Sequence, residues 1–313
     1  MSLGLTPLPG IRVSLNELVA LRHHIREFQL FSTPSRRSPL IGLHHSRLRG
    51  RGVDFDQVRA YLPGDDVRSI DWRVTARTQE PHTKLYHEER ERPVFILVEQ
   101  SRRTFFGSGE RLKSVLAAEL ASLIGWAALA HNDRVGGLVF SDREWHEVRP
   151  RRRKQSLLQF LNRLSHANQL LSSEQWAPGA EPFTIALRRC REVLRPGSLI
   201  FVICDERALG DQSEAQLSLL ARHNDLVLLP LADPLDHQLP QTGRLRFGQN
   251  GRELRLDTDL PSLQQGYQQL ADKRLQRWAS LSQRLAVPLL NLDTRQNGLS
   301  QLIQHLQPLS GRQ

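Results

Sequence analysis

The chain has 313 residues, of which 39% are hydrophobic and 24% charged, so it can build a packed core and is not wholly disordered. No uncharged apolar run of about 18 residues is present, and no charged start precedes an apolar stretch. We therefore expect a cytoplasmic protein without a membrane span. The net charge of +10 favours an acidic partner, either nucleic acid or an acidic protein surface.

The two cysteines, Cys190 and Cys204, have neither the pattern of a disulfide framework nor the spacing of metal ligands. Both lie in apolar stretches, where a cysteine is usually a small buried hydrophobic residue. A reducing compartment fits this pattern.

A helix over about 15–30 is predicted by the capping-box spacing of Ser14 and Glu17 and by apolar residues at helical intervals. A loop rich in Ser, Pro, Gly and Arg follows over 32–52. It carries one basic cluster, made of Arg36, Arg37, Arg47, Arg49 and Arg51.

The densest motif lies between residues 50 and 77, where Pro63-Gly64-Asp65-Asp66 predicts a turn. Its carboxylates are free to cap backbone amides, or to gather a hard cation through oxygen ligands. Because arginines lie among them in similar number, we favour bidentate arginine–carboxylate pairs and a rigid ion-paired knot. The structural motif residues are Gly64, Asp65, Asp66, Arg68, Asp71, Trp72 and Arg77.

From residue 94 onward, strands and helices alternate, which predicts an α/β fold with a doubly wound, mostly parallel sheet. Strands are predicted at 94–98, 134–140, 145–149, 198–204, 226–231 and 286–292, the third antiparallel to the second. Helices are predicted at 111–131, 152–165, 183–194, 213–222 and 262–284 and at the end of the chain, the first of them amphipathic. Asn250-Gly251 predicts a hairpin over 241–257. Ligand sites in such folds follow the strands, so the positions after 98 and 204 are the first candidates.

The motif region resembles the signature of the bacterial domain-of-unknown-function family 58 (DUF58). The matching positions are Gly50, Gly52, Asp54, Phe55, Arg59, Tyr61, Gly64-Asp65-Asp66, Arg68, Ile70-Asp71-Trp72 and Ala76-Arg77, and shorter matches continue to about residue 240. We expect residues 1–90 to form an N-terminal extension, and the ion-paired knot favours its docking on the sheet. The resemblance implies a von Willebrand factor A-like domain over 91–313. It also implies association with a MoxR-type AAA+ ATPase in assembly or maintenance of other proteins, envelope proteins among them, and leaves room for a membrane-bound partner.

Domains of that fold often hold Mg²⁺ through an Asp-x-Ser-x-Ser loop, a threonine and a later aspartate. The matching loop here runs from Glu99 through Ser101 to Arg103, with Thr184 and Asp205 as the other candidates. Glu99 reaches one methylene too far, and Arg103 replaces a hydroxyl ligand with a positive charge, although Mg²⁺ tolerates little distortion. We expect a degenerate, empty metal site. The Arg103 guanidinium either pairs with Asp205 or Glu99, or points into solvent and leaves the site intact.

No phosphate-binding loop is present, and no base is placed beside Ser101, so we expect no enzymatic activity. The leading hypothesis is a protein-binding adaptor or co-chaperone whose contact surface is the top of the sheet. Arginines would steer acidic partners to it, namely Arg102, Arg103, Arg151, Arg152 and Arg153. The alternatives are a nucleic-acid-binding protein and a metal-dependent nuclease that uses Asp65, Asp66 and Asp71.

Overall fold

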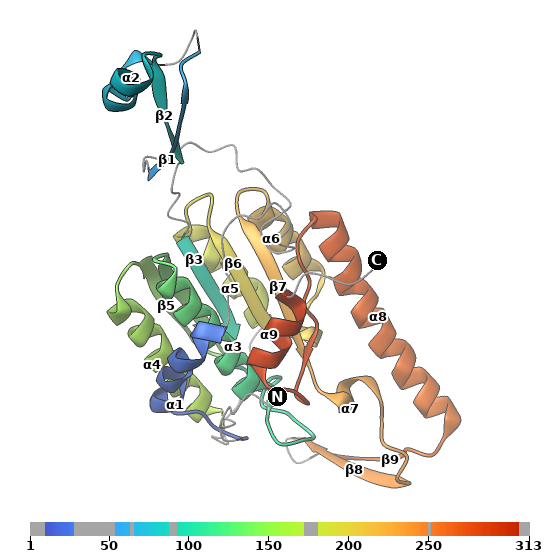
Figure 1. The fold of residues 1–313 in the computed structure, drawn as a ribbon. Helices are drawn as coiled ribbons and strands as arrows, with labels where there is room; N and C mark the ends of the chain where they lie inside the picture. Colours follow the sequence, from blue (N-terminus) through green and yellow to red (C-terminus); the bar gives the residue numbers. More distant parts are fainter. Residues whose placement is uncertain are drawn as a thin grey trace. The chain divides into compact units, whose positions relative to one another are not determined.

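The computed structural model describes residues 10–27, 54–62, 66–87, 93–171, 181–249 and 252–306 (Figure 1). The basic cluster between Arg36 and Arg51, together with Gly64, Asp65 and the Asn250-Gly251 turn, lies outside these ranges. The chain divides into two compact units. One contains Met1–His44 and Pro93–Gln313, and the other contains His45–Arg92.

The larger unit is built on a six-stranded sheet in the order β10-β7-β6-β3-β4-β5. The strands are β3 (Pro93–Glu99), β4 (Arg134–Phe140), β5 (Trp145–Arg151), β6 (Leu199–Asp205), β7 (Asp225–Ala232) and β10 (Leu292–Asp293). All pair in parallel except β5, which runs antiparallel to β4. Continuous apolar runs form the central strands because the sheet is covered on both faces. The predicted fold class is confirmed, and the last strand is shorter than predicted.

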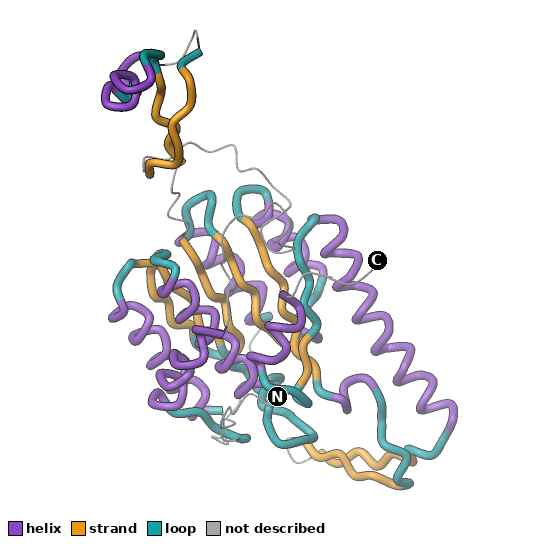
Figure 2. The backbone as a smooth tube through the Cα atoms, viewed as in Figure 1, coloured by secondary structure: helices purple, strands orange, loops and turns teal. Residues whose placement is uncertain are grey.

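Helices cover both faces of the sheet (Figure 2). The first face carries α1 (Leu15–Ala20), α3 (Lys113–Ala130), α4 (Lys154–Leu170) and α9 (Gly298–Leu306). The second carries α5 (Pro182–Val193), α6 (Asp211–Ala221) and α8 (Pro261–Leu285). Two separate apolar clusters result, one on each side of the central strands.

Helix α3 is buried on all sides, so the prediction that it is amphipathic was wrong. Every residue from Lys113 to Ala128 is buried. The outer face is covered by α1, since Ser122 Oγ and Trp126 Nε1 both donate to the carbonyl oxygen of Leu18, at 2.7 and 3.1 Å. Among the described helices, α3 alone is long and apolar enough to cross a bilayer, and 89% of it is buried inside the protein.

The N-terminal segment belongs to the α/β unit. Ser14 and Glu17 form the predicted capping box, and α1 continues as the 3-10 helix η1 (Leu21–Glu27) instead of one long α-helix. Helix α1 packs against α3 and α4, and the division of the chain at residue 90 stays a prediction.

The smaller unit pairs β1 (Asp54–Ala60) with β2 (His82–His87) in an antiparallel hairpin that sequence reasoning did not predict. Two short helices lie between these strands, η2 (Val67–Ser69) and α2 (Trp72–Thr78). That this unit docks on the sheet stays a prediction.

The segment after β7 leaves the sheet. It forms α7 (Pro234–His237) and then the predicted hairpin, β8 (Arg244–Gln249) paired with β9 (Arg252–Asp257). The Tyr267 hydroxyl of α8 donates to the carbonyl oxygen of Leu235 at 2.6 Å, which holds α7 against the long helix.

Gly137 lets α4 pack directly on β4. A Cβ atom at this position would lie 2.5 Å from the carbonyl oxygen of Ile96 and would also collide with the Phe160 ring. We expect Gly137→Ala to lower the free energy of unfolding by about 1–3 kcal/mol. Denaturant titration measures this, with Gly248→Ala as the control because nothing lies within 4 Å of the added methyl group there. Equal effects of the two substitutions would contradict the packing argument.

Candidate functional site

The carboxyl ends of β3 and β6 bring together two of the residues expected after the strands. Glu99 ends β3 and Asp205 ends β6, and both side chains are buried. The backbone amide of Asp205 donates to Glu99 Oε2 at 2.8 Å, and the Ser101 hydroxyl donates to Glu99 Oε1 at 2.5 Å. The adjacent parallel pairing of these strands makes this meeting unavoidable.

Lys113 supplies the central cation of this site, and sequence reasoning missed it. It is the first residue of α3 and has no exposed surface. Its Nζ lies 2.5 Å from Asp205 Oδ2 and 2.7 Å from Asp236 Oδ2. Because the N-terminus of a helix disfavours a positive charge, and burial disfavours any charge, the two carboxylates are what make this position tolerable.

Arg207 completes the coordination of Asp205 from the rim. Its Nε lies 2.9 Å from Asp205 Oδ1 and its second terminal nitrogen 3.0 Å from Oδ2, a two-pronged contact that matches guanidinium geometry. The Arg207 backbone amide also donates to Oδ1. Both oxygens of Asp205 are therefore engaged by cations and amides.

A second layer ties this cluster to the surrounding segments. Asp233 Oδ2 accepts from the Thr294 hydroxyl at 2.6 Å and from the Ser108 amide at 2.8 Å. Glu206 lies 2.7 Å from His237 Nε2 and 3.0 Å from Arg274 Nε. The hydrogen bond to Glu206 raises the pKa of His237. The ends of β6 and β7, the loop before α3 and helix α8 are thereby held in one arrangement.

The two central carboxyl groups titrate in opposite directions. Burial alone would raise the pKa of Asp205, but the hydrogen bonds from Arg207 and the charge of Lys113 outweigh it and hold that pKa below its usual value. Burial and the neighbouring Asp205 carboxylate raise the pKa of Glu99 to about 7. Asp205 is thus the carboxylate that balances the cations, and Glu99 is the group that tends to hold a proton.

These residues do not fit a magnesium ion. The oxygens of Asp205 are taken by Lys113 and Arg207, and the Ser101 hydroxyl both donates to Glu99 and accepts from the Arg103 amide. A dication 4 Å from the Lys113 ammonium would be repelled by about 8 kcal/mol at an effective dielectric constant of about 20. Within the described ranges, no group of three or more His, Cys, Asp or Glu side chains is arranged to hold a metal.

Lys113 and Arg207 engage Asp205, so Arg103 pairs with neither Asp205 nor Glu99 and is exposed, as one of the two expectations had it. Its guanidinium donates to the carbonyl oxygen of Arg207 at 3.1 Å, and Arg207 in turn donates to the carbonyl oxygen of Arg103 at 3.2 Å. The two exposed arginines therefore fasten the loops after β3 and β6 together. Thr184, the candidate threonine ligand, donates instead to the Glu181 carboxylate at 3.0 Å.

Two aspartates of the smaller unit, Asp66 and Asp71, act as helix caps. Asp66 accepts from the Arg68 amide, and Asp71 accepts from the amides of Arg73 and Val74. Asp66 and Asp71 therefore cap backbone amides, which was one of the roles expected for these carboxylates. The nuclease hypothesis gains no support from either residue. Arg68, Trp72 and Arg77 are exposed.

The five arginines expected to steer partners do not form one surface. Arg102 and Arg103 follow β3 at the carboxyl edge of the sheet. Arg151 pairs with Val135 near the start of β4, whereas Trp145 pairs with Phe140 at its end. Arg151, Arg152 and Arg153 therefore lie at the amino edge, about five strand residues or ~16 Å away.

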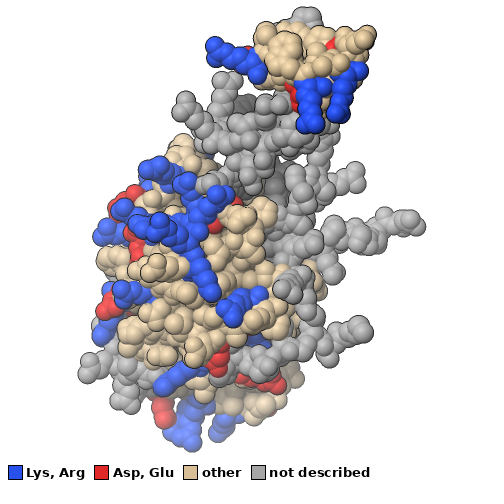
Figure 3. Space-filling view, turned by 60° about the vertical axis from the view of Figure 1, so that its left-hand side comes forward, with Lys and Arg blue, Asp and Glu red and all other residues tan. Residues whose placement is uncertain are grey.

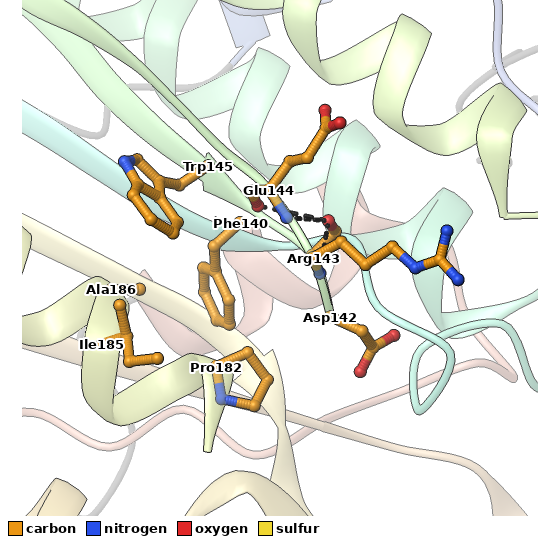
Figure 4. Close-up of a pocket in the computed structure, with 9 residues that line it drawn as sticks. Phe140, Asp142, Arg143, Glu144, Trp145, Pro182, Ile185 and Ala186 are labelled. Carbon is orange, nitrogen blue, oxygen red and sulfur yellow. Dashed lines mark hydrogen bonds between the residues drawn. The ribbon is translucent and has the colours of Figure 1, made fainter. Parts of the chain in front are cut away.

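Beside the carboxyl edge lies a small hollow that sequence reasoning did not find (Figure 4). Its apolar lining comes from the end of β4, the start of β5 and the first turns of α5, namely Phe140, Trp145, Pro182, Ile185 and Ala186. Asp142, on its rim, accepts from the Arg102 amide at 2.8 Å, so the hollow adjoins the loop after β3.

The family model for "Protein of unknown function DUF58" matches residues 57–277. The chain belongs to the DUF58 family. Among curated DUF58 relatives, uncharacterized protein Rv1480 of Mycobacterium tuberculosis (strain ATCC 25618 / H37Rv) is 26% identical over 273 residues, which cover 84% of this chain and 82% of that protein.

Two solved structures resemble this DUF58 protein in fold. The conserved hypothetical protein BatB from Bacteroides thetaiotaomicron is 16% identical, with a TM-score of 0.40, over 68% of this chain and 94% of that one. The VWA domain of SpRpn10 is 11% identical, with a TM-score of 0.39, over 72% of this chain and 100% of that one.

The titration of Glu99 predicts a pH dependence of stability. Its folded pKa lies above the value of 4.5 that it has when unfolded, so the stabilisation is complete below pH 4.5 and is lost as the pH rises through about 7. We expect Glu99→Gln to remove this loss. Between pH 4.5 and about 7, the difference in free energy of unfolding between the variant and the wild type should then change in favour of the variant by up to about 1.4 kcal/mol per pH unit. Denaturant titrations at pH 5 and pH 8 measure the difference. The exposed Glu253→Gln serves as the control, and parallel stability profiles for wild type and Glu99→Gln would refute the assignment.

Proposed function

We propose that this DUF58 protein is a non-enzymatic adaptor that binds other proteins through the carboxyl edge of its sheet. One observation carries the proposal. The acidic groups of that edge are satisfied internally by Lys113 and Arg207, while arginine side chains remain at the surface above them. An edge of this kind is suited to recognise a partner rather than to transform a substrate.

The chemistry of the edge favours an acidic partner. Arg103 is exposed, and a guanidinium has five N–H donors, of which one contacts the Arg207 carbonyl oxygen. The remaining donors suit a carboxylate from another protein. The neighbouring hollow offers Trp145 and Ile185, which are 44% and 38% exposed, for an apolar side chain of the same partner.

Catalysis is not part of this proposal. The Ser101 hydroxyl donates to Glu99, as a nucleophile donates to a base in an active site. Sequence reasoning did not place Glu99 as a base beside Ser101. Both side chains are at most 1% exposed, however, so a substrate has no access to the hydroxyl group. The arrangement is suited to fixing the loop after β3.

We further propose that the partner is a MoxR-type AAA+ ATPase and that the protein works in the cytoplasm. The DUF58 membership supports the first point through the family association, and the net charge of +10 supports an acidic partner surface. The buried, free thiols of Cys190 and Cys204 support a reducing compartment.

Charge reversal at Arg103 tests the docking edge. With the purified MoxR-type ATPase of the same organism as binding partner, we expect Arg103→Glu to weaken binding at least about tenfold because a carboxylate of the partner would then be repelled. Surface plasmon resonance measures the affinity, and Arg163→Glu on the exposed face of α4 is the matched control. Equal affinities for the two variants would locate binding elsewhere, and no binding by the wild type would refute the ATPase as partner.

Nucleic-acid binding is a second candidate because cations gather at the amino edge of the sheet. The residues are Arg134, Arg149, Arg151, Arg152, Arg153 and Lys154, all exposed. Figure 3 shows Lys and Arg side chains concentrated on the face of the larger unit that it brings forward. Two acidic groups lie beside these six cations, the buried Asp133 and Glu147, which is 3.6 Å from Arg149, so the cations outnumber them.

The amino-edge patch predicts a specific salt dependence. If about four of its cations contact phosphates, the logarithm of the affinity for a 20-base-pair DNA duplex falls with the logarithm of salt concentration with a slope of about −4. Arg151→Glu with Arg153→Glu should reduce this slope by about 2. Fluorescence anisotropy measures both values, and absence of binding at low salt would eliminate this candidate.

A further inference from the structure

The buried ammonium group of Lys113 contacts two carboxylates and lies where several segments meet. These carboxylates belong to Asp205 at the end of β6 and Asp236 in α7. Asp236 also accepts from the Asp233 amide at 2.9 Å, which continues the network to the end of β7. One positive charge therefore connects the first turn of α3 with the ends of two neighbouring strands.

We propose that the Lys113 ammonium is a tethered cation that does for this carboxyl edge what a bound divalent ion would otherwise do. It lies between Asp236 and Asp205, one of the candidate metal ligands, and it comes with the chain instead of from solution. The edge is then fixed in one arrangement at any magnesium concentration. This inference concerns how the edge is held and stands independently of the partner proposed above.

The local surroundings fit a permanent ammonium group. The Phe106 ring lies 5.4 Å from Lys113 Nζ, which favours a cation through its π face. Arg207 contacts Asp205 from the other side and reaches Asp236 Oδ1 at 3.5 Å, so two cations share two carboxylates. This balance leaves no excess negative charge between Asp205 and Asp236 to attract a dication.

The same geometry explains why the lysine needs its length. Lys113 lies in the first turn of α3, and the carboxylates that it meets come from elements 92 and 123 residues further along the chain. A shorter side chain at this position would leave a space between two carboxylates. With alanine, that space has the size of the missing methylene groups and ammonium group, and the two carboxylates beside it would attract a replacement cation.

A pair of substitutions separates the role of the charge from that of the volume. Lys113→Ala removes the charge and leaves the space, and Lys113→Met removes the charge but fills the space. We expect both variants to unfold at lower temperature than the wild type. Only Lys113→Ala should regain stability when millimolar MnCl₂ or ethylammonium chloride is added, because only it has room for a cation next to Asp205.

The measurements are thermal unfolding midpoints of the full chain with and without MnCl₂, MgCl₂, EDTA and ethylammonium, together with electron paramagnetic resonance of bound Mn²⁺. For the wild type we expect no shift with any additive and no bound Mn²⁺. A shift of the wild-type midpoint by MgCl₂ or its reversal by EDTA would overturn the proposal, as would identical responses of Lys113→Ala and Lys113→Met.

A further variant keeps the test decisive if neither substitution folds. Lys113→Met combined with Asp236→Asn removes one charge of each sign and leaves Asp205 paired with Arg207. If Lys113 serves to balance the two carboxylates, this double variant should fold and be more stable than Lys113→Met alone. A double variant that is less stable than the single one, or that also fails to fold, would show that Lys113 acts by some other means than its charge.

Discussion

The contact between Lys113 and Asp205 is the constraint on which the arrangement of the carboxyl edge depends. A fully buried ammonium is tolerated because two carboxylates surround it, and Asp205 is in turn held by the guanidinium fork of Arg207. Arg207 and Arg103 each donate a hydrogen bond to the carbonyl oxygen of the other. The charge balance in the interior therefore helps to position the Arg103 side chain at the surface. Removing Lys113 would leave Asp205 and Asp236 to share the single guanidinium of Arg207, so the members of this network depend on one another.

The sequence supports the fold better than the site, and the reason lies in the range of the interactions. Continuous apolar runs and turn residues are local signals, and they predict the central strands to within one or two residues. The meeting of Glu99 and Asp205 is also predictable, because parallel strands end at the same edge. Lys113 has no such signal. In the sequence it is a charge that interrupts an apolar helix, and its partner Asp236 lies 123 residues further on.

Two errors in the sequence interpretation have the same physical origin. Helix α3 has polar residues at intervals that suggest a solvent-facing side, but α1 covers that side, and Ser122 and Trp126 hydrogen-bond to Leu18 there. Likewise, Arg103 follows Ser101 at the spacing of a metal ligand and so attracts attention, whereas Arg207 makes the actual contact from the loop after β6. In both cases the identity of the residue is visible in the sequence and its partner is supplied by another element.

The net charge of +10 is distributed unevenly, and this decides what each edge of the sheet can recognise. At the carboxyl edge the cations are balanced by Asp205 and Asp236, so only the outermost arginine donors are available to a partner. Recognition there depends on the shape of the surface as much as on its charge. At the amino edge Arg151 and Arg153 lack such internal partners among the described residues, so attraction there is long-ranged and weakened by salt. Total charge alone therefore cannot distinguish a protein partner from nucleic acid, because the carboxyl edge suits a protein and the amino edge suits nucleic acid.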